Sequence, residues 1–424
     1  MKYKRWLYPG IGVKRWVLLM VVSFIMISAG ISIFLDYQLV SRLEELIVAL
    51  FSPVVEEGLY FFNIIIALML MTGGLLGINF ALRGVVRGLY RMGEDNKYIN
   101  KMYKENVLEK GPRVVALGGG TGLSNLLRGL KHYTSNITAI VTVADDGGSS
   151  GKLRKELGML PPGDIRNCLV ALADAEPLMQ ELFQYRFSSE GHLVGHSFGN
   201  LFIASLTEVL GDFEEAVRES SKVLAIRGQV LPATNENVHL GAVYNDKTVK
   251  LGESVIPDDD RKIERVFLQP SDCKPTADAL EAIQEADIIV IGPGSLYTSI
   301  IPNLMVTGIP GAIKNSEACK MYICNVMTQP GETTDYTVGD HIRAINKHGG
   351  EDLFDYVVAN KGRGTKSLTR KYEKEGAYSV RIDKKEIEDQ GVALVEGNLL
   401  SMETYLRHDP DQLAEIIFRI AGSR

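Results

Sequence analysis

The sequence is poor in cysteine and has no cysteine pattern that is typical of a metal site or a disulfide framework. Its four cysteines, Cys168, Cys273, Cys319 and Cys324, include no CxxC pair and no matching histidine pattern. A structural zinc site needs closely spaced thiolate or imidazole ligands, and disulfide frameworks are found in oxidising compartments. We therefore expect four reduced cysteines that act as small apolar residues in a reducing compartment.

The C-terminal three-quarters of the chain lack an excess of positive charge. The whole chain has a net charge of −6, and residues 1–110 carry 13 basic and 9 acidic side chains, so residues 111–424 have a net charge near −10. No basic stripe with interleaved aromatic residues runs through this part. An acidic domain of this kind does not attract a phosphate backbone, so we expect no nucleic-acid partner. An anionic ligand would have to be held by local features.

Charged residues are absent from two long apolar runs near the N-terminus, residues 16–35 and 58–82. At about 1.5 Å per residue, either run can cross a hydrocarbon core of roughly 30 Å. A cleaved signal peptide is the alternative for the first run, and a buried core helix for the second. The first run lacks a small-x-small cleavage site and is followed by another apolar run, which disfavours a signal peptide. We predict two transmembrane helices in a helical hairpin.

Basic residues flank this hairpin at both of its ends. Five precede the first run without any acidic residue, and seven follow the second, whereas residues 36–57 hold only Arg42 against five acidic residues. Because basic segments stay on the cytoplasmic side, both ends should face the cytoplasm. We expect a two-pass membrane anchor and a basic linker over residues 1–110, at the cell membrane. Residues 111–424 should form a cytoplasmic domain.

A glycine-rich turn follows the first strand that we expect in the C-terminal domain. Residues 113–117 are a short apolar run, residues 118–122 read GGGTG, and residues 123–130 show helical spacing of leucines. A strand, a glycine turn and a helix N-terminus together offer backbone N–H donors and a positive dipole end to a phosphate group. The spacing is not GxGxxG, because Leu123 occupies the position of the third glycine. A dinucleotide cofactor such as NAD is therefore disfavoured.

Acidic side chains follow the second expected strand, residues 137–143. Asp145 and Asp146 come directly after it, and a run of glycine and serine follows at residues 147–151. Ligands of doubly wound sheets bind at the carboxyl ends of the strands, where a carboxylate can accept ribose hydroxyls or hold a divalent cation. Either aspartate alone could equally cap a helix. Asp164, in the segment PPGDIRN, could likewise be only an N-cap.

A second glycine turn, GPGSLYTS at residues 292–299, follows another apolar run at residues 287–291 and precedes a helix start. Two polar segments, residues 196–200 and 232–239, could hydrogen-bond a base or a sugar, or could be polar turns. Two strand-end turns that are far apart in the sequence and both suited to anions suggest one ligand that spans a crevice. We predict an α/β fold with a Rossmann-like, doubly wound, mainly parallel sheet, preceded by the two-helix transmembrane hairpin.

Six segments, in this order, resemble the gluconeogenesis factor family, a CofD-like family. They are GGGTGLSNLLRGLK, TAIVTVADDGGSSGKLR, PPGDIRN, GHSFGNL, IGPGSLYTSIIPNL and YICNVMTQPGET. The resemblance runs from about residue 112 to the C-terminus. It implies a fold similar to that of the 2-phospho-L-lactate transferases of coenzyme F420 synthesis. Typical members begin near the first strand, so the N-terminal hairpin is a departure from the family pattern.

The resemblance implies a regulatory protein that binds UDP-N-acetylglucosamine and supports cell-wall precursor supply and cell shape on gluconeogenic carbon sources. It also implies a ligand that lies across the strand-end crevice and an enzyme of hexosamine synthesis as the protein partner. The implied ligand contacts are Gly119, Gly120, Thr121 and Gly122 for phosphate, Asp145 and Asp146 for ribose or a cation, Asn200, Asn235, Gly294, Ser295 and Tyr297 for other polar atoms, and a later arginine, for which we choose Arg343. The sequence leaves a homo-oligomer open.

Two other classes of function stay open. A transferase that moves a phospho-acyl group from a nucleoside diphosphate carrier would need a divalent ion such as Mg²⁺ on the diphosphate. Asp145, Asp146 and Asp164 are the candidate catalytic residues for that chemistry, and Asp145 and Asp146 are the candidate metal ligands. The third class, an NAD-dependent oxidoreductase, conflicts with the glycine spacing. We choose the regulator, and we assign no cofactor beyond Mg²⁺ with a nucleoside diphosphate.

Overall fold

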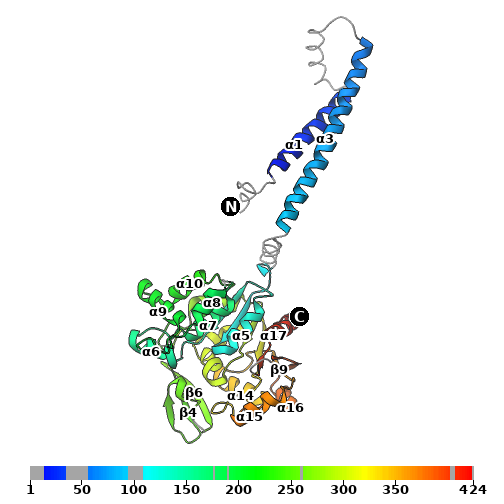
Figure 1. Ribbon diagram of the computed structural model, residues 1–424. Coiled ribbons are helices and arrows are strands. Elements are labelled where there is room, and N and C mark those ends of the chain that lie inside the picture. The colour runs from blue at the N-terminus through cyan, green and yellow to red at the C-terminus, as the bar shows by residue number, and fades with distance from the viewer. Residues whose placement is uncertain are drawn as a thin grey trace. The chain divides into compact units, whose positions relative to one another are not determined.

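The computed structural model describes seven stretches of the chain, residues 14–34, 56–93, 108–174, 177–188, 191–257, 261–401 and 406–422. The loop expected between the two apolar runs and most of the basic linker lie outside these residues. The chain divides into two compact units, Met1–Lys104 (unit 1) and Glu105–Arg424 (unit 2). Figure 1 shows a pair of long helices in unit 1 and a globular α/β body in unit 2.

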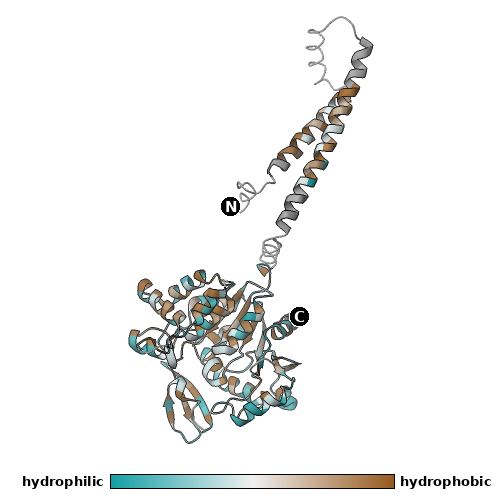
Figure 2. Ribbon diagram, in the orientation of Figure 1, coloured by the Kyte–Doolittle hydropathy of each residue, from teal (hydrophilic) through white to brown (hydrophobic). Residues whose placement is uncertain are grey.

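Within the described part of unit 1, two helices, α1 (Lys14–Phe34) and α3 (Glu56–Gly93), pack side by side. Small residues lie at their contact. A Cβ atom built on Gly74 would lie 2.8 Å from the carbonyl oxygen of Ser23, and Ser23 is almost completely buried. Small residues let two helix backbones approach closely, as they do in membrane helix pairs. Apolar residues run along both helices (Figure 2).

The described residues of the two helices differ as candidate membrane spans. Among the described residues, one segment, Ile64–Gly84 of α3, is long and apolar enough to span a membrane. The described apolar part of α1, Leu18–Phe34, has 17 residues. The prediction of two spans, at 16–35 and 58–82, is therefore not confirmed, and the described residues support one candidate span.

Cysteines placed at Ser23 and Gly77 are expected to cross-link α1 to α3. A Cβ atom built on Gly77 lies 3.2 Å from the Cβ atom of Ser23, close to the roughly 3.5–4.5 Å of a disulfide. Oxidation of the Ser23→Cys, Gly77→Cys protein should give an intramolecular cross-link on a non-reducing gel. The control is Phe24→Cys with Gly77→Cys, because Phe24 is 70% exposed. Equal yields from the two pairs would contradict this helix packing.

A seven-stranded parallel sheet forms the centre of unit 2. Its order is β10-β9-β8-β7-β1-β2-β3, and every neighbouring pair is parallel. The strands are β1 (Val114–Gly118), β2 (Ile137–Val141), β3 (Gln229–Pro232), β7 (Ile288–Ile291), β8 (Cys319–Ile323), β9 (Tyr356–Asn360) and β10 (Ala393–Gly397). The chain builds outward from β1 to β3, then returns and builds outward from β7 to β10. The order thus reverses between β1 and β7, which confirms the doubly wound sheet.

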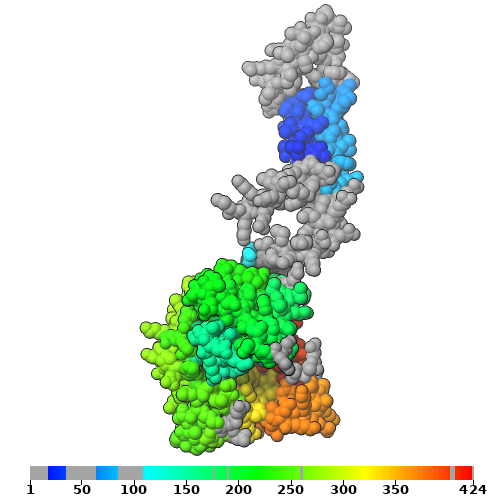
Figure 3. All heavy atoms as spheres, turned by 60° about the vertical axis from the view of Figure 1, so that its left-hand side comes forward, coloured from blue at the N-terminus to red at the C-terminus, as the bar shows by residue number. Residues whose placement is uncertain are grey.

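Helices cover both faces of this sheet, and the strands at its centre are consequently apolar throughout. All residues of β1, β2 and β7 are buried, which explains their continuous runs of Val, Ile, Leu and Ala. The helices are α5 (Gly120–Leu130), α6 (Gly148–Leu157), α7 (Gly163–Leu172), α8 (Pro177–Gln184), α9 (Phe198–Leu210), α10 (Phe213–Val223), α11 (Ala277–Glu285), η3 (Leu296–Ile300), α12 (Ile301–Leu304), α13 (Ile309–Asn315), α14 (Val338–Gly349), α15 (Lys366–Lys374), α16 (Lys384–Asp389) and α17 (Pro410–Ala421). In the space-filling view, the green first half of unit 2 and the orange region of α15 and α16 occupy separate parts of the surface (Figure 3).

Two small antiparallel sheets supplement the central one. Strands β4 (His239–Tyr244), β5 (Val249–Leu251) and β6 (Ile263–Gln269) pair in the order β5-β4-β6, and a short 3₁₀ turn, η2 (Glu253–Val255), follows β5. Strands β11 (Leu400–Ser401) and β12 (Arg407–His408) form a two-stranded ladder. The sequence did not predict either sheet. Both of them bring side chains to the carboxyl ends of the central strands, as described below.

Candidate functional site

The two glycine turns lie against each other at the carboxyl ends of β1 and β7. A Cβ atom built on Gly122 would lie 2.6 Å from the carbonyl oxygen of Pro293, and one built on Gly294 would lie 3.4 Å from the carbonyl oxygen of Gly119. The first of these approaches leaves no room for any side chain, so glycine is required at residue 122. The fold thus joins two segments that are far apart in the sequence, at the point where the strand order reverses.

A cavity of about 200 Å³ opens between these turns, and we call it the switch-point crevice. Six of the predicted ligand residues line it: Gly119, Gly120, Thr121, Gly122, Gly294 and Ser295. Asn125, one turn along α5 from Thr121, and His408 of β12 line it as well. Because α5 begins at Gly120, the positive end of its dipole lies at the crevice. This edge of the sheet is therefore suited to an anion.

Asp164 lies at the start of α5. Its carboxylate accepts a hydrogen bond from the backbone N–H of Gly120, and it does not cap its own helix, α7. Burial raises the pKa of Asp164 to about 6, with a further increase from the Asp145 carboxylate, against the opposing effects of the Gly120 N–H and Arg166. A carboxyl group that titrates near pH 6 can gain or lose a proton under physiological conditions.

Two further glutamates that the sequence did not indicate join this acidic group. Burial, followed by the neighbouring carboxylates with Asp145 first among them, raises the pKa of Glu253 well above its usual range. Glu332 is 4% exposed and accepts a hydrogen bond from the backbone N–H of Tyr297 at 3.1 Å. Burial raises the pKa of Glu332 to about 7. Only the folded chain brings these two loops to the site, so no sequence motif contained both.

Asp145 and Asp146 have different surroundings. Asp145 Oδ1 accepts a hydrogen bond from the N–H group two residues further along at 2.8 Å, whereas Asp146 Oδ1 accepts one from the N–H of Ser254 at 2.8 Å. Asp146 therefore holds η2 in place, while Asp145 lies near Asp164 and Glu253. Across the described residues, no three His, Cys, Asp or Glu side chains form a group that could hold a metal ion. Mg²⁺ often binds through one or two carboxylates and the phosphates of its ligand, and Asp145 is the better placed of the two for that arrangement.

Asn200 lies next to the serine run that follows β2. Its Nδ2 donates to Ser149 Oγ at 3.1 Å, and His196 Nδ1 lies 3.0 Å from the same oxygen. All three side chains are buried. Asn200 Oδ1 has no hydrogen-bond partner among the described residues. The segments HSFGN and DDGGSS, which were separate in the sequence, are therefore connected at the first turn of α6.

Asn235 and Tyr297 are not among the residues that line the switch-point crevice. Asn235 is exposed, and its Nδ2 donates to Glu214 Oε2 at 2.8 Å. Tyr297 is 3% exposed, and its hydroxyl group lies 2.8 Å from that of Tyr336. Its backbone belongs to the second glycine turn, but its ring is buried beside the Tyr336 ring.

Arg343 lies at the opposite edge of the sheet. It projects from α14, forms an ion pair with Asp340 at 2.7 Å and forms a second one with Glu386. The hollow beside it, of about 740 Å³, includes residues that immediately precede β9 and β10. The structure therefore does not place Arg343 with the glycine turns.

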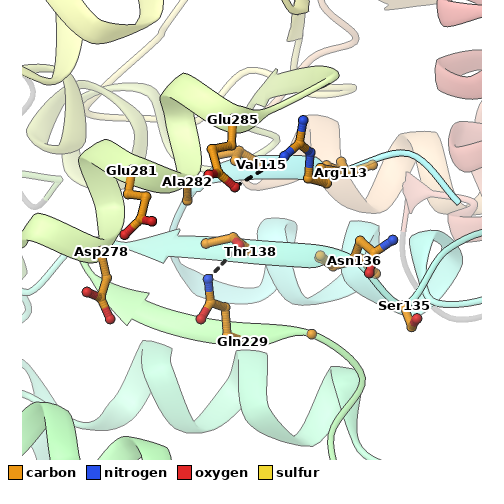
Figure 4. Close-up of a pocket in the computed structure, with 13 residues that line it drawn as sticks. Arg113, Val115, Ser135, Asn136, Thr138, Gln229, Asp278, Glu281, Ala282 and Glu285 are labelled. Carbon is orange, nitrogen blue, oxygen red and sulfur yellow. Dashed lines mark hydrogen bonds and ion pairs between the residues drawn. The ribbon is translucent and has the colours of Figure 1, made fainter. Parts of the chain in front are cut away.

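Another hollow, of about 500 Å³, opens at the amino ends of β1, β2 and β3. Figure 4 shows Arg113 paired with Glu285 at 3.2 Å, and Gln229 hydrogen-bonded to Thr138 at 3.0 Å. Carboxylates of α11 line one side of it. We do not assign a nucleotide to this hollow, because doubly wound folds bind ligands at the carboxyl ends of their strands and because carboxylates repel phosphate.

Replacing Glu332 by glutamine is expected to reduce the pH dependence of stability. A carboxyl group whose pKa is raised by folding binds its proton more tightly in the folded state, so wild-type stability falls as the pH rises from about 4.5 to about 7. A pKa difference of this size corresponds to roughly 3 kcal/mol. Urea unfolding near pH 5 and near pH 8 should show the wild type losing more stability than Glu332→Gln by about this amount. The same pH dependence in both proteins would contradict the burial of a titrating carboxyl group.

Comparison with known proteins agrees with this geometry. Residues 114–400 match the family model described as 2-phospho-L-lactate transferase CofD. The chain belongs to the CofD family. It is 43% identical over 424 residues to a putative gluconeogenesis factor of Clostridium acetobutylicum, covering 98% of this chain and 91% of that protein. It is 50% identical over 307 residues to the gluconeogenesis factor of Bacillus subtilis, covering 72% of this chain and 97% of that protein.

A crystal structure of a Bacillus halodurans protein superposes on this CofD-family chain with a TM-score of 0.72 at 51% identity, covering 73% of this chain and 100% of that one. That length corresponds to unit 2, which therefore folds without unit 1 in a relative. The Clostridium acetobutylicum relative, by contrast, matches nearly the whole chain. The expectation that the N-terminal segment departs from the family pattern is corrected, because CofD-family proteins include chains with and without it.

Proposed function

We propose that unit 2 binds UDP-N-acetylglucosamine in the switch-point crevice and that the protein is a regulator of the gluconeogenesis factor type. The observation that carries this proposal is the meeting of the two glycine turns, residues 119–122 and 292–295, on one cavity at the carboxyl ends of β1 and β7. Glycine backbone and a helix N-terminus can hold a diphosphate, and Arg407 adds a positive charge to the lining of this crevice. The uridine and the sugar would extend along the polar loops on either side.

The regulatory role takes its support from the relatives, which are named gluconeogenesis factors. In this proposal, bound UDP-N-acetylglucosamine reports the supply of cell-wall precursor, and the protein acts on an enzyme of hexosamine synthesis during growth on gluconeogenic carbon sources. Loss of the protein would then change cell shape under those conditions.

Hydrogen–deuterium exchange with and without UDP-N-acetylglucosamine tests the location of the site. We expect slower exchange of backbone amides at residues 119–126 and 294–300, because the ligand would cover both turns. Residues 351–354 and 389–392, which line the hollow beside Arg343, serve as the internal control and should be unchanged. Protection confined to those control residues would move the site to the opposite edge of the sheet.

A transferase is the second candidate function, and the acidic group at the crevice favours it. The Asp145 carboxylate helps to raise the pKa of Asp164, and both of these carboxylates help to raise the pKa of Glu253. In this alternative, Asp145 and the ligand diphosphate would hold Mg²⁺, and Asp164 would accept the proton that the incoming acceptor group releases. Mg²⁺-dependent consumption of a nucleoside diphosphate carrier would establish it. Binding of UDP-N-acetylglucosamine without turnover would favour the regulator.

We further propose that unit 1 anchors the protein in the cell membrane as a two-pass hairpin, with unit 2 in the cytoplasm. Large apolar side chains point away from the contact between α1 and α3: Phe24 is 70% exposed, Leu76 72% and Met69 67%. Such a surface suits lipid better than water. Removal of residues 1–104 should shift the protein from the membrane fraction to the soluble fraction. Full-length protein in the soluble fraction would contradict the anchor.

A further inference from the structure

A second cavity adjoins the switch-point crevice, and three arginines line it. Its volume is about 240 Å³. Arg128 comes from α5, Arg166 from α7 and Arg407 from β12, and Thr121, Asn125 and Arg407 line both this cavity and the crevice. Its described lining includes no carboxylate. We call it the arginine cavity. Three cations from three separate elements make this hollow beside the proposed nucleotide site strongly basic.

Arg166 is the decisive residue of the arginine cavity, because it is a buried cation that forms no ion pair with any residue the structure describes. It is 6% exposed, and its guanidinium group donates to the neutral acceptors Ser197 Oγ and Asn167 Oδ1. Its Nε has no hydrogen-bond partner within the described ranges. Burial and then Arg186 lower the pKa of Arg166 to about 10, although Asp164 partly opposes them. A buried charge without a bonded counter-ion is costly, and an anion in the cavity would offset that cost.

We propose that the arginine cavity binds the phosphate group of a second, small ligand beside the nucleotide, so that the protein responds to two anions together. This proposal rests on the proposed function, since UDP-N-acetylglucosamine is what would occupy the adjoining crevice. A phosphate monoester carries close to two negative charges and three acceptor oxygens, which suits guanidinium groups that arrive from three directions. A carboxylate ligand, by contrast, needs only one bidentate arginine, so three arginines fit a phosphate better. With roughly 30 Å³ per water molecule, the cavity has room for a phosphate and several further atoms.

Phosphorus NMR of unit 2 tests the proposal, with inorganic phosphate as the probe and UDP-N-acetylglucosamine at saturation. Unit 2 is suitable because the Bacillus halodurans relative folds without unit 1. The inorganic phosphate signal should broaden on addition of protein and stay broadened when the nucleotide sugar is bound. Arg128→Gln should weaken phosphate binding by about tenfold or more. Arg419→Gln is the matched control, since both arginines are exposed and lie in the last turn of a helix, and it should leave the affinity unchanged.

Each of the other outcomes separates the two proposals. Displacement of inorganic phosphate by UDP-N-acetylglucosamine would make the arginine cavity part of the nucleotide site and overturn the second ligand. Equal losses in Arg128→Gln and Arg419→Gln, or binding of acetate as tightly as phosphate at equal ionic strength, would overturn it as well. The protein could also bind phosphate through Arg128 and fail to bind UDP-N-acetylglucosamine. That result would support the arginine cavity and contradict the proposed function.

Discussion

Gly122→Ala should abolish the binding of UDP-N-acetylglucosamine by unit 2. The added methyl group would lie 2.6 Å from the carbonyl oxygen of Pro293 and 3.0 Å from the Cα atom of Gly294. Both contacts are with backbone, so no side-chain rotation relieves them, and the two turns must separate. Repacking of this kind costs about 1–3 kcal/mol of stability. The loss of affinity should exceed 100-fold, because both turns contribute to one crevice.

The matched control for this substitution is Gly311→Ala. Gly311 lies in α13, and a Cβ atom built on it has no neighbour within 4 Å. Alanine there should leave binding unchanged and stabilise the helix by up to about 1 kcal/mol. Thermal unfolding of both variants would show that each is folded before titration. An affinity in Gly122→Ala within threefold of the wild type would show that the packed glycine turns do not form the binding site.

Binding of the nucleotide diphosphate should strengthen as the pH falls through about 6, and Asp164→Asn should remove most of that dependence. Burial and Asp145 raise the pKa of Asp164 to about 6. Above this pH the ionised carboxylate at the start of α5 repels the diphosphate, and below it the neutral carboxyl group does not. The diphosphate of a UDP-sugar does not titrate in this range. Because binding is linked to the uptake of one proton, the affinity should increase roughly tenfold or more between pH 7.5 and pH 5.

This pH profile also distinguishes the two candidate functions. In EDTA, the affinity for UDP-N-acetylglucosamine should rise as the pH falls. The control is Asp352→Asn, which alters an exposed carboxylate paired with Lys314 and should show the same pH dependence as the wild type. If Mg²⁺ instead binds the diphosphate near Asp164, as in the transferase alternative, affinity in Mg²⁺ would rise with pH, because the ionised Asp164 carboxylate attracts the cation. That opposite slope would contradict the direct-repulsion account and favour the transferase.

The sequence predicted the inner strands β1, β2 and β7 of the central sheet because local signals determine them, whereas it did not indicate β3, β9 or β10. The continuous apolar runs at 113–117, 137–143 and 287–291 correspond to strands that are buried on both faces, and each ends at a glycine or aspartate turn. The small sheet formed by β4, β5 and β6 was missed, because β5 has only three residues and none of them is buried. Local hydrophobic patterning is weak in such strands.

The candidate site was only partly predictable, because a motif fixes where the backbone goes but not where each side chain points. The glycine turns met as expected, since backbone alone makes that contact. Tyr297, from the same motif, is buried beside Tyr336. Arg343 was chosen as a positively charged ligand contact, but it forms ion pairs with two neighbouring carboxylates. Glu332 and Arg166 reach the site through long-range packing, which no spacing in the sequence encodes.

Calorimetric titration of unit 2 with UDP-N-acetylglucosamine, in parallel with GDP and NAD and with and without Mg²⁺, tests the central claim most directly. The account predicts saturable binding of one UDP-N-acetylglucosamine per chain, no binding of NAD and no requirement for Mg²⁺. Absence of UDP-N-acetylglucosamine binding together with Mg²⁺-dependent binding of GDP would contradict the account and leave the transferase as the better description of the switch-point crevice.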